Sequence, residues 1–237
     1  MLFDQSDYDI RCEWGEKGVS TLAPISDVVI IVDVLSFSTS VEIAASQGAV
    51  VYPYRWKDET AAEFADSIEA ELADENNKRG YCLSPASLQA LPSGIRLVLP
   101  SPNGSSLSLS TGSTATIAGC LRNCRAVAES AMRKGGTVAV IPAGERWDEG
   151  TLRPSVEDLL GAGAVIAHLR GTLSPEARVA MAAFEVLSSN LLEHIKKCSS
   201  GREKIARGEL GDVIIACELN ASVCVGILTN GAYRQEE

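Results

Sequence analysis

Polar side chains that could bind a metal ion or a phosphate group follow three apolar runs of the sequence. Asp33 directly follows one such run, Glu145 and Arg146 follow a second, and the segment 101–106 follows a third. Carboxylates are ligands that hard cations such as Mg²⁺ prefer, and the planar guanidinium of an arginine matches the oxygens of a phosphate. These segments are therefore our candidates for the chemistry of the protein, with Asp33, Glu145 and Arg146 as catalytic residues.

Each candidate also has a purely structural interpretation. Asp33 could cap the helix that follows it, Asn103-Gly104 is a common turn pair, and Glu145-Arg146 could be a surface ion pair. A helix that begins at Gly104 would instead direct free N–H groups toward a phosphate. With both interpretations open, we predict these residues as substrate ligands: Ser38, Thr39, Ser101, Asn103, Gly104, Ser105 and Arg146.

The metal ligands predicted from the sequence are all acidic: Asp33, Glu145, Glu157 and Asp212. Ser155-Val-Glu-Asp158 matches the capping pattern at a helix start, which assigns Asp158 to structure and leaves Glu157 free to be a ligand. Asp212 opens an apolar run instead of ending one. It therefore reaches the same edge of a sheet only if its strand is antiparallel.

Apolar runs alternate with helix-like segments along the whole chain, which is typical of an α/β layer fold. The run 28–32 lacks polar alternation and predicts a strand buried on both faces of a parallel or mixed sheet. Ligands commonly bind at the carboxyl edge of such a sheet. We expect strands at about 27–34, 49–54, 95–100, 137–142, 211–217 and 223–229, and helices at about 38–47, 58–75, 104–110, 122–134, 155–169, 175–197 and 201–208, with an exposed loop at 76–80.

Composition limits the class of protein. The chain has 237 residues, 46% of them hydrophobic, and a net charge of −10, which fits one large α/β domain over 1–237 and disfavours a nucleic-acid surface. The first residues lack the features of a signal peptide and no apolar run is long enough to span a bilayer, so we expect no membrane partner and a cytoplasmic location. Seven cysteines are an odd number, which excludes a complete disulfide framework. The sequence leaves a homodimer open.

Several common catalytic motifs are absent from the sequence. It contains no P-loop, no Gly-x-Ser-x-Gly and no His-Glu-x-x-His. Its two histidines, His168 and His194, both fall in expected helices. A mechanism based on histidine therefore has little support.

Four short motifs in register resemble the 2-phosphosulfolactate phosphatase (ComB) family. They are Val32-Asp-Val-Leu, Ser101-Pro-Asn-Gly-Ser, Pro142-Ala-Gly-Glu-Arg-Trp and Glu157-Asp-Leu-Leu-Gly-Ala-Gly-Ala. The resemblance covers nearly the whole chain and implies a three-layer α/β/α fold with a mixed sheet. It also implies a Mg²⁺-dependent acid phosphatase that hydrolyses a small phosphorylated acid, 2-phosphosulfolactate or a related phosphate ester.

One position departs from the family pattern. The family usually reads Asp-Val-Leu-Arg-Ala, whereas this chain has Ser36 and Phe37 after Asp33-Val-Leu. Loss of a cation there predicts that 2-phosphosulfolactate is a poor substrate and that esters with fewer charges are preferred. The alternatives are another organophosphate-processing enzyme on the same fold and a non-catalytic metabolite-binding protein. Attack by water and covalent attack by Asp33 both remain open.

Overall fold

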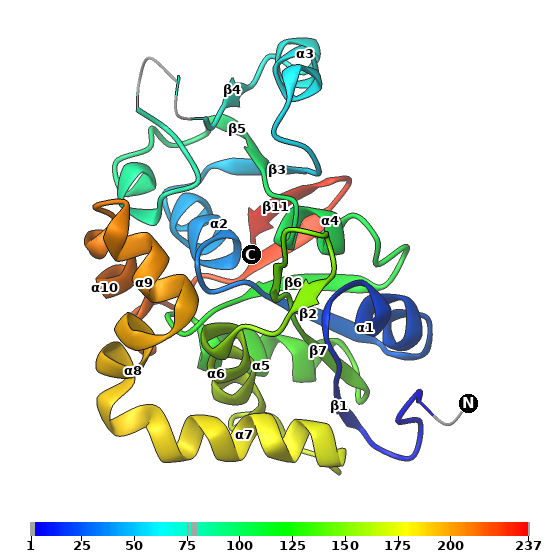
Figure 1. The fold of residues 1–237 in the computed structure, drawn as a ribbon. Coiled ribbons are helices and arrows are strands. Elements are labelled where there is room, and N and C mark those ends of the chain that lie inside the picture. The colour runs from blue at the N-terminus through cyan, green and yellow to red at the C-terminus, as the bar shows by residue number, and fades with distance from the viewer. Residues whose placement is uncertain (1–2, 75, 77–79, 237) are drawn as a thin grey trace.

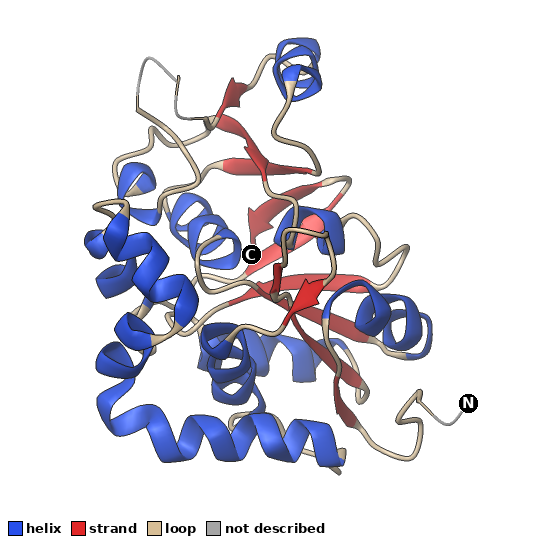
Figure 2. Cartoon of the chain, in the orientation of Figure 1, coloured by secondary structure: helices blue, strands red, loops and turns tan. Residues whose placement is uncertain are grey.

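A nine-stranded mixed sheet forms the centre of the molecule (Figures 1 and 2). The computed structural model describes residues 3–74, 76 and 80–236. Across the sheet the strands follow in the order β1 (Ile10–Cys12), β7 (Val138–Pro142), β2 (Val28–Val32), β6 (Ala115–Gly119), β10 (Gly226–Thr229), β11 (Ala232–Gln235), β3 (Val50–Tyr54), β5 (Arg96–Pro100) and β4 (Glu71–Leu72). A separate small hairpin pairs β8 (Glu145–Arg146) with β9 (Leu152–Arg153).

Two groups of parallel strands are joined by an antiparallel hairpin. Strands β1, β7, β2 and β6 pair in parallel, as do β3, β5 and β4. The hairpin of β10 and β11 lies between them and pairs antiparallel with β6 and β3. The sheet is therefore mixed, as expected.

Helices cover both faces of this sheet (Figure 1). Their bounds are α1 (Gly15–Leu22), α2 (Phe37–Ser46), α3 (Glu59–Ser67), α4 (Gly104–Ser108), α5 (Cys124–Lys134), α6 (Val156–Ile166), α7 (Pro175–Leu187), α8 (Leu191–Lys197), α9 (Ser199–Ala206) and α10 (Leu210–Ala216). Short 3-10 segments lie at Ala23–Ile25, Pro85–Leu88 and Ser188–Asn190. The three-layer α/β/α architecture is confirmed.

Strand β2 shows why its sequence has no polar alternation. Val28, Ile30 and Val32 share one hydrophobic cluster with residues of α5, α6 and α7. Val29 and Ile31 point to the other face and share a cluster with residues of α1 and α4. Burying each such side chain contributes about 1.5–3 kcal/mol, so both faces must be apolar. The strand ends where the polar Asp33 begins the loop to α2.

The segment expected as a strand at 211–217 is instead the helix α10, and that prediction was wrong. A short apolar run does not distinguish a strand from a buried helix. In α10, Val213 and Ala216 are buried whereas Ile214 is 45% exposed, a spacing of three that one helical face produces. Asp212 consequently lies in the first turn of a helix and not at the edge of the sheet.

Other boundaries also differ from the expected ones. The helix predicted over 58–75 ends at Ser67, and the one predicted over 175–197 is divided by the 3-10 segment at 188–190. Helix α1 and the strands β1, β6 and β11 were not predicted. The loop expected at 76–80 lies mostly outside the described residues.

None of the helices in the described part of the chain is both long and apolar enough to cross a membrane.

Candidate active site

Asp33 lies in the loop between β2 and α2, where it is only 6% exposed. Its Oδ1 accepts a hydrogen bond from the backbone N–H of Phe37 at 3.1 Å, and its Oδ2 accepts one from Gly104 at 3.0 Å. The first bond ties Asp33 to the start of α2, so the side chain has the capping role that the sequence left open. The second joins the segment after β5 to the end of β2.

A cavity of about 200 Å³ opens beside Asp33. Its wall contains two acids, Asp33 and Glu145, that follow strands of the sheet, and it is closed on another side by residues of α9. The remaining wall comes from loops after β3 and β5 and from the segment before the 3-10 turn at 85–88. The lining residues are Asp33, Leu35, Ser36, Lys57, Leu83, Ser101, Pro102, Asn103, Glu145, Ser200, Glu203, Lys204 and Arg207.

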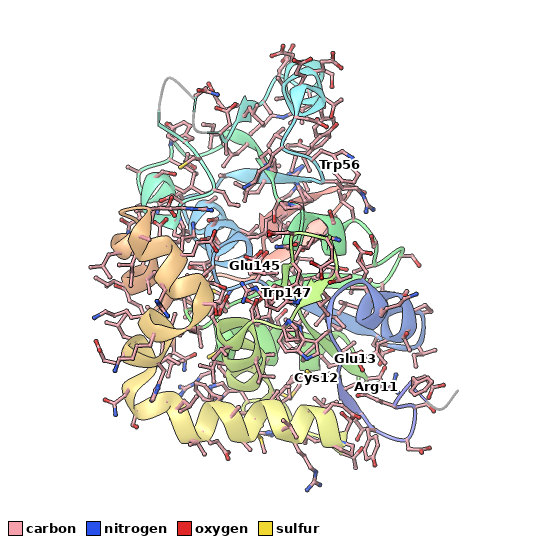
Figure 3. All side chains as sticks on the ribbon, in the orientation of Figure 1. Arg11, Cys12, Glu13, Trp56, Glu145 and Trp147 are labelled. Atoms are coloured by element: carbon pink, nitrogen blue, oxygen red, sulfur yellow. The ribbon has the colours of Figure 1, made fainter. Side chains whose placement is uncertain are left out.

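Glu145, labelled near the centre of the view in Figure 3, lies on the short strand β8 that follows β7. Its Oε2 accepts a hydrogen bond of 2.8 Å from Nδ2 of Asn103. This bond joins the segments after β5 and β7, so three strand ends contribute side chains to one site. Two residues predicted as substrate ligands, Ser101 and Asn103, also line the cavity.

Burial raises the pKa values of both cavity carboxyl groups. Burial raises the pKa of Asp33 to about 6, against the ordinary 3.8, with a smaller contribution from the charge of Glu157. Burial also raises the pKa of Glu145 to about 7, and the neighbouring charge of Asp33 acts in the same direction. Both groups therefore exchange protons closer to neutral pH than ordinary carboxyl groups do.

Asp158 and Glu157 lie behind the cavity at the start of α6. Asp158 accepts hydrogen bonds from the backbone N–H groups of Val34 at 2.7 Å and Gly144 at 2.9 Å, which ties the loop after β2 to the loop after β7. Burial raises its pKa well above the ordinary value. The predicted capping box was wrong, because the side chain of Ser155 makes no capping hydrogen bond. Asp158 instead stabilises the structure by joining these two loops.

Glu157, predicted as a metal ligand, is 2% exposed, and its Oε2 accepts a hydrogen bond of 3.2 Å from the Cys198 thiol. Its charge reaches the site, because it contributes to raising the pKa values of Asp33 and Glu145. The cavity wall is formed by other residues. Any role of Glu157 toward a metal is therefore indirect in this arrangement.

Several hydroxyl groups predicted to bind phosphate point into the protein. Ser38 Oγ donates to the carbonyl of Ile31 at 2.9 Å, and Thr39 Oγ1 donates to that of Val34 at 2.8 Å. Ser105 Oγ donates to the carbonyl of a β5 residue, also at 2.9 Å. These side chains stabilise the loops around Asp33, and as the structure stands their hydroxyl groups are occupied.

Gly104 is required by close packing. A Cβ atom at this position would lie 2.2 Å from Cδ1 of Phe37, and the N–H of Gly104 already donates to Asp33. The structure thus uses this N–H to hold a catalytic candidate. It does not leave it free for a phosphate.

The two arginines near β8 have different surroundings. Arg146 pairs with Glu16 at 2.5 Å and lines a second cavity of about 170 Å³ on the side of α1. Arg153 donates to Oγ of Ser200 at 3.1 Å, and its charge lowers the pKa of Glu145. Arg153 therefore lies nearer to the wall of the first cavity, whereas the role predicted for Arg146 stays a prediction.

Asp212 is separated from the other predicted ligands. Its Oδ1 accepts hydrogen bonds from Oγ of Ser84 at 2.6 Å and from the backbone N–H of Ala86 at 3.1 Å. It fixes α10 to the 3-10 segment beside it. Asp212 does not line the cavity beside Asp33. Its role as a metal ligand stays a prediction.

Nine residues of the cavity wall were not among the predicted site residues: Leu35, Ser36, Lys57, Leu83, Pro102, Ser200, Glu203, Lys204 and Arg207. The charge of Lys204 contributes to lowering the pKa of Asp33, against the larger effect of burial. Ser200, Glu203, Lys204 and Arg207 recur at the spacing i, i+3, i+4 and i+7, which places them on one face of α9 and its C-cap residue Arg207. That spacing was visible in the sequence, but only the fold shows that this face covers the strand ends.

Among the residues that the structure describes, no three His, Cys, Asp or Glu side chains form a ready-made metal cluster. Magnesium commonly uses only one or two carboxylates and completes its shell with water and substrate phosphate. Asp33 and Glu145 are the two carboxylates of strand-end loops that reach the cavity. The predicted ligand set of Asp33, Glu145, Glu157 and Asp212 stays a prediction.

Known proteins resemble this chain over almost its whole length. A 2-phosphosulfolactate phosphatase of Methanothermobacter thermautotrophicus is 28% identical over 221 residues, covering 87% of this chain and 88% of that protein. A probable 2-phosphosulfolactate phosphatase of Thermotoga petrophila is 30% identical over 229 residues, covering 91% and 97%. The family profile described as 2-phosphosulpholactate phosphatase matches residues 17–231. The chain therefore belongs to the 2-phosphosulpholactate phosphatase family, a family of phosphatases.

Proposed function

We propose that this protein hydrolyses a small phosphate monoester that carries at least one further acidic group, such as 2-phosphosulfolactate, with the help of Mg²⁺. The observation that carries the proposal is one cavity in which two carboxyl groups of raised pKa, Asp33 and Glu145, face cationic side chains. The names of the relatives support the same substrate class. The cations supplied by α9 favour an acidic ester, despite the serine at position 36.

The residues of the cavity fit a magnesium ion. Each carboxylate oxygen of Asp33 accepts one backbone hydrogen bond, and a carboxylate oxygen offers more than one acceptor site. The charge of Glu157 contributes to raising the pKa of Asp33, and the charges of Asp33 and Glu157 contribute to raising that of Glu145, which is the electrostatic situation that a divalent cation relieves. When bound, Mg²⁺ would neutralise phosphate charge and activate a water molecule. Asp33 and Glu145 would hold it.

The side chains would divide the remaining chemistry between them. Glu145, with a pKa of about 7, can exchange a proton with water or with the leaving oxygen near neutral pH. Asn103 orients Glu145 through its hydrogen bond. Asp33 either positions the attacking water or attacks the phosphorus itself. The backbone N–H groups that hold Asp33 fix its direction in both cases.

The test is release of inorganic phosphate from small organophosphates in the presence of Mg²⁺ or EDTA. We expect release with Mg²⁺, none with EDTA, and loss of activity in Asp33→Asn and Glu145→Gln. Asp27→Asn is the matched control, because Asp27 is an exposed aspartate that binds Gly136 and Thr137.

Full activity in EDTA would contradict the metal. Esters that raise the melting temperature without releasing phosphate would identify a binding protein. Product formation that requires an acceptor would identify another organophosphate enzyme.

A further inference from the structure

We propose that α9 and Ser36 form a specificity subsite, in which Lys204, Arg207 and the Ser36 hydroxyl bind the second acidic group of the substrate. This inference rests on the proposed function and assigns residues to a part of the substrate that Asp33 and Glu145 do not touch. None of these three residues is among the substrate ligands that we predicted from the sequence.

Ser36 carries an unused hydrogen-bonding group. The residue is 3% exposed, and its Oγ has no hydrogen-bond partner among the described residues. A buried hydroxyl without a partner destabilises a protein, and native structures rarely retain one without a reason. Ser36 lines the cavity. A bound ligand is therefore the partner that this hydroxyl lacks.

The neighbouring hydroxyls show that this is specific to position 36. Ser38 and Thr39 follow in the first turn of α2, and both hydroxyl groups donate to backbone carbonyls. Only Ser36 among these three combines an unpaired hydroxyl with a place in the cavity wall. Its role is to bind a ligand, because it does not stabilise the loop.

Lys204 and Arg207 supply the positive charge of the subsite. Lys204 pairs with Glu209 at 2.7 Å and keeps a side chain only 18% exposed. Arg207 pairs with Glu203 at 2.5 Å. An ammonium group has three donors and a guanidinium has five, so one ion pair leaves each side chain able to bind a further anion.

The wall of the cavity contains acidic, apolar and cationic side chains. Asp33 and Glu145 are acidic and suit the metal and the phosphoryl group. Leu35, Leu83 and Pro102 add apolar wall, which suits a carbon skeleton. The cations that α9 adds to the wall suit a second anionic substituent, a carboxylate or a sulfonate.

Three esters with one carbon skeleton test this assignment. Isopropyl phosphate has no further acidic group, 2-phospholactate adds a carboxylate, and 2-phosphosulfolactate adds a sulfonate as well. Lys204→Met and Arg207→Met should lower kcat/KM for the two acidic esters by about tenfold or more, the effect of losing one charge-assisted hydrogen bond. The loss should appear mainly in KM. For isopropyl phosphate we expect less than about a fivefold change, as for a screened charge.

Arg202→Met is the matched control, because Arg202 is an exposed cation of the same helix but lies two residues from Lys204 and so on a different face. It should behave like the unmodified protein with all three esters. Ser36→Ala gives an independent readout. It should weaken binding of the acidic esters while the melting temperature stays unchanged or rises, because the unpaired hydroxyl is removed.

An equal loss for all three esters would overturn the assignment, because the cations would then act on the phosphoryl group. Unchanged kinetics with the acidic esters in both α9 variants would overturn it as well. If no ester is hydrolysed, the proposed function fails, but stabilisation of the protein by each ester still tests the subsite. The acidic esters should then raise the melting temperature of the unmodified protein more than that of Lys204→Met, and equal shifts would refute the subsite.

Discussion

Asp33→Asn should change how the stability of the metal-free protein depends on pH. Burial raises the pKa of Asp33 to about 6 from 3.8, so ionising this group in the folded protein costs about 3 kcal/mol more than in the unfolded chain. A raised folded pKa means that the contribution is fully present below about pH 4 and is lost as the pH rises through 6. By pH 8 the unmodified protein should have lost about 3 kcal/mol through this one group.

Asparagine cannot ionise, so the variant should lack this loss. It also has one acceptor oxygen for the two N–H groups of Phe37 and Gly104, which adds a cost of about 1–3 kcal/mol that does not depend on pH. The informative quantity is therefore the change in unfolding free energy between pH 5 and pH 8. The unfolding free energy at a single pH would combine the lost cost of ionisation with the lost hydrogen bond. Removing the Asp33 charge also lowers the pKa of Glu145, which flattens the profile further.

The assay is urea unfolding at both pH values in EDTA, repeated with Mg²⁺. About half of the 3 kcal/mol is already lost by pH 5, because that pH lies above the unfolded pKa of 3.8. The expected difference between pH 5 and pH 8 is therefore about 1.4 kcal/mol, or roughly 3–6 °C in melting temperature for a chain of this size. Magnesium should stabilise the unmodified protein more at pH 8 than at pH 5 and should stabilise the variant less. The control Asp27→Asn should give a profile parallel to that of the unmodified protein between pH 5 and pH 8, since hydrogen bonds from Thr137 lower the pKa of Asp27 and its contribution is lost only as the pH falls below the ordinary 3.8. Parallel profiles for Asp33→Asn and the unmodified protein would refute the reasoning.

Three further substitutions follow from the packing and the ion pairs. Gly104→Ala should destabilise the protein by about 1–3 kcal/mol in urea unfolding, because the added methyl group would overlap an aromatic ring. Arg122→Met should cost about 3–5 kcal/mol in the same assay, since it leaves the carboxylate of Glu42, 1% exposed, without its cation; a loss below about 1 kcal/mol, as for a surface ion pair, would refute this prediction. Arg153→Ala should lower kcat/KM more than Arg146→Ala, because Arg153 contacts the cavity wall; the reverse order would restore the prediction made from the sequence.

The strands that carry the site could be predicted because their sequences are constrained on both faces. Each of β2, β5 and β7 lies within about two residues of its expected position, and Asp33, Asn103 and Glu145 come together as the rule for strand ends implies. Helix α10 could not be identified, because the five apolar residues 213–217 are compatible with a strand or a helix until the packing is known.

The direction of each hydroxyl could not be predicted from composition. Ser36, Ser38 and Thr39 are close in sequence and similar in chemistry, yet the path of the chain into α2 directs two of their hydroxyl groups to backbone carbonyls and leaves one unpaired. The contribution of α9 is also a tertiary property. Its polar face lies some 170 residues beyond Asp33 in the sequence, and only the packing of α8, α9 and α10 against one another brings it to the cavity.

Comparison of Asp33 with Asp158 shows what distinguishes a chemical from a structural carboxylate in this fold. Both follow the same local rule, since each accepts two backbone hydrogen bonds and each is nearly buried. In both cases burial is the main cause of a raised pKa. Neither hydrogen bonding nor pKa therefore separates them. Access to the cavity separates them, because only Asp33 of these two lines it. Asp158 cannot reach a ligand in the cavity, so its role is to hold the loops that position Asp33.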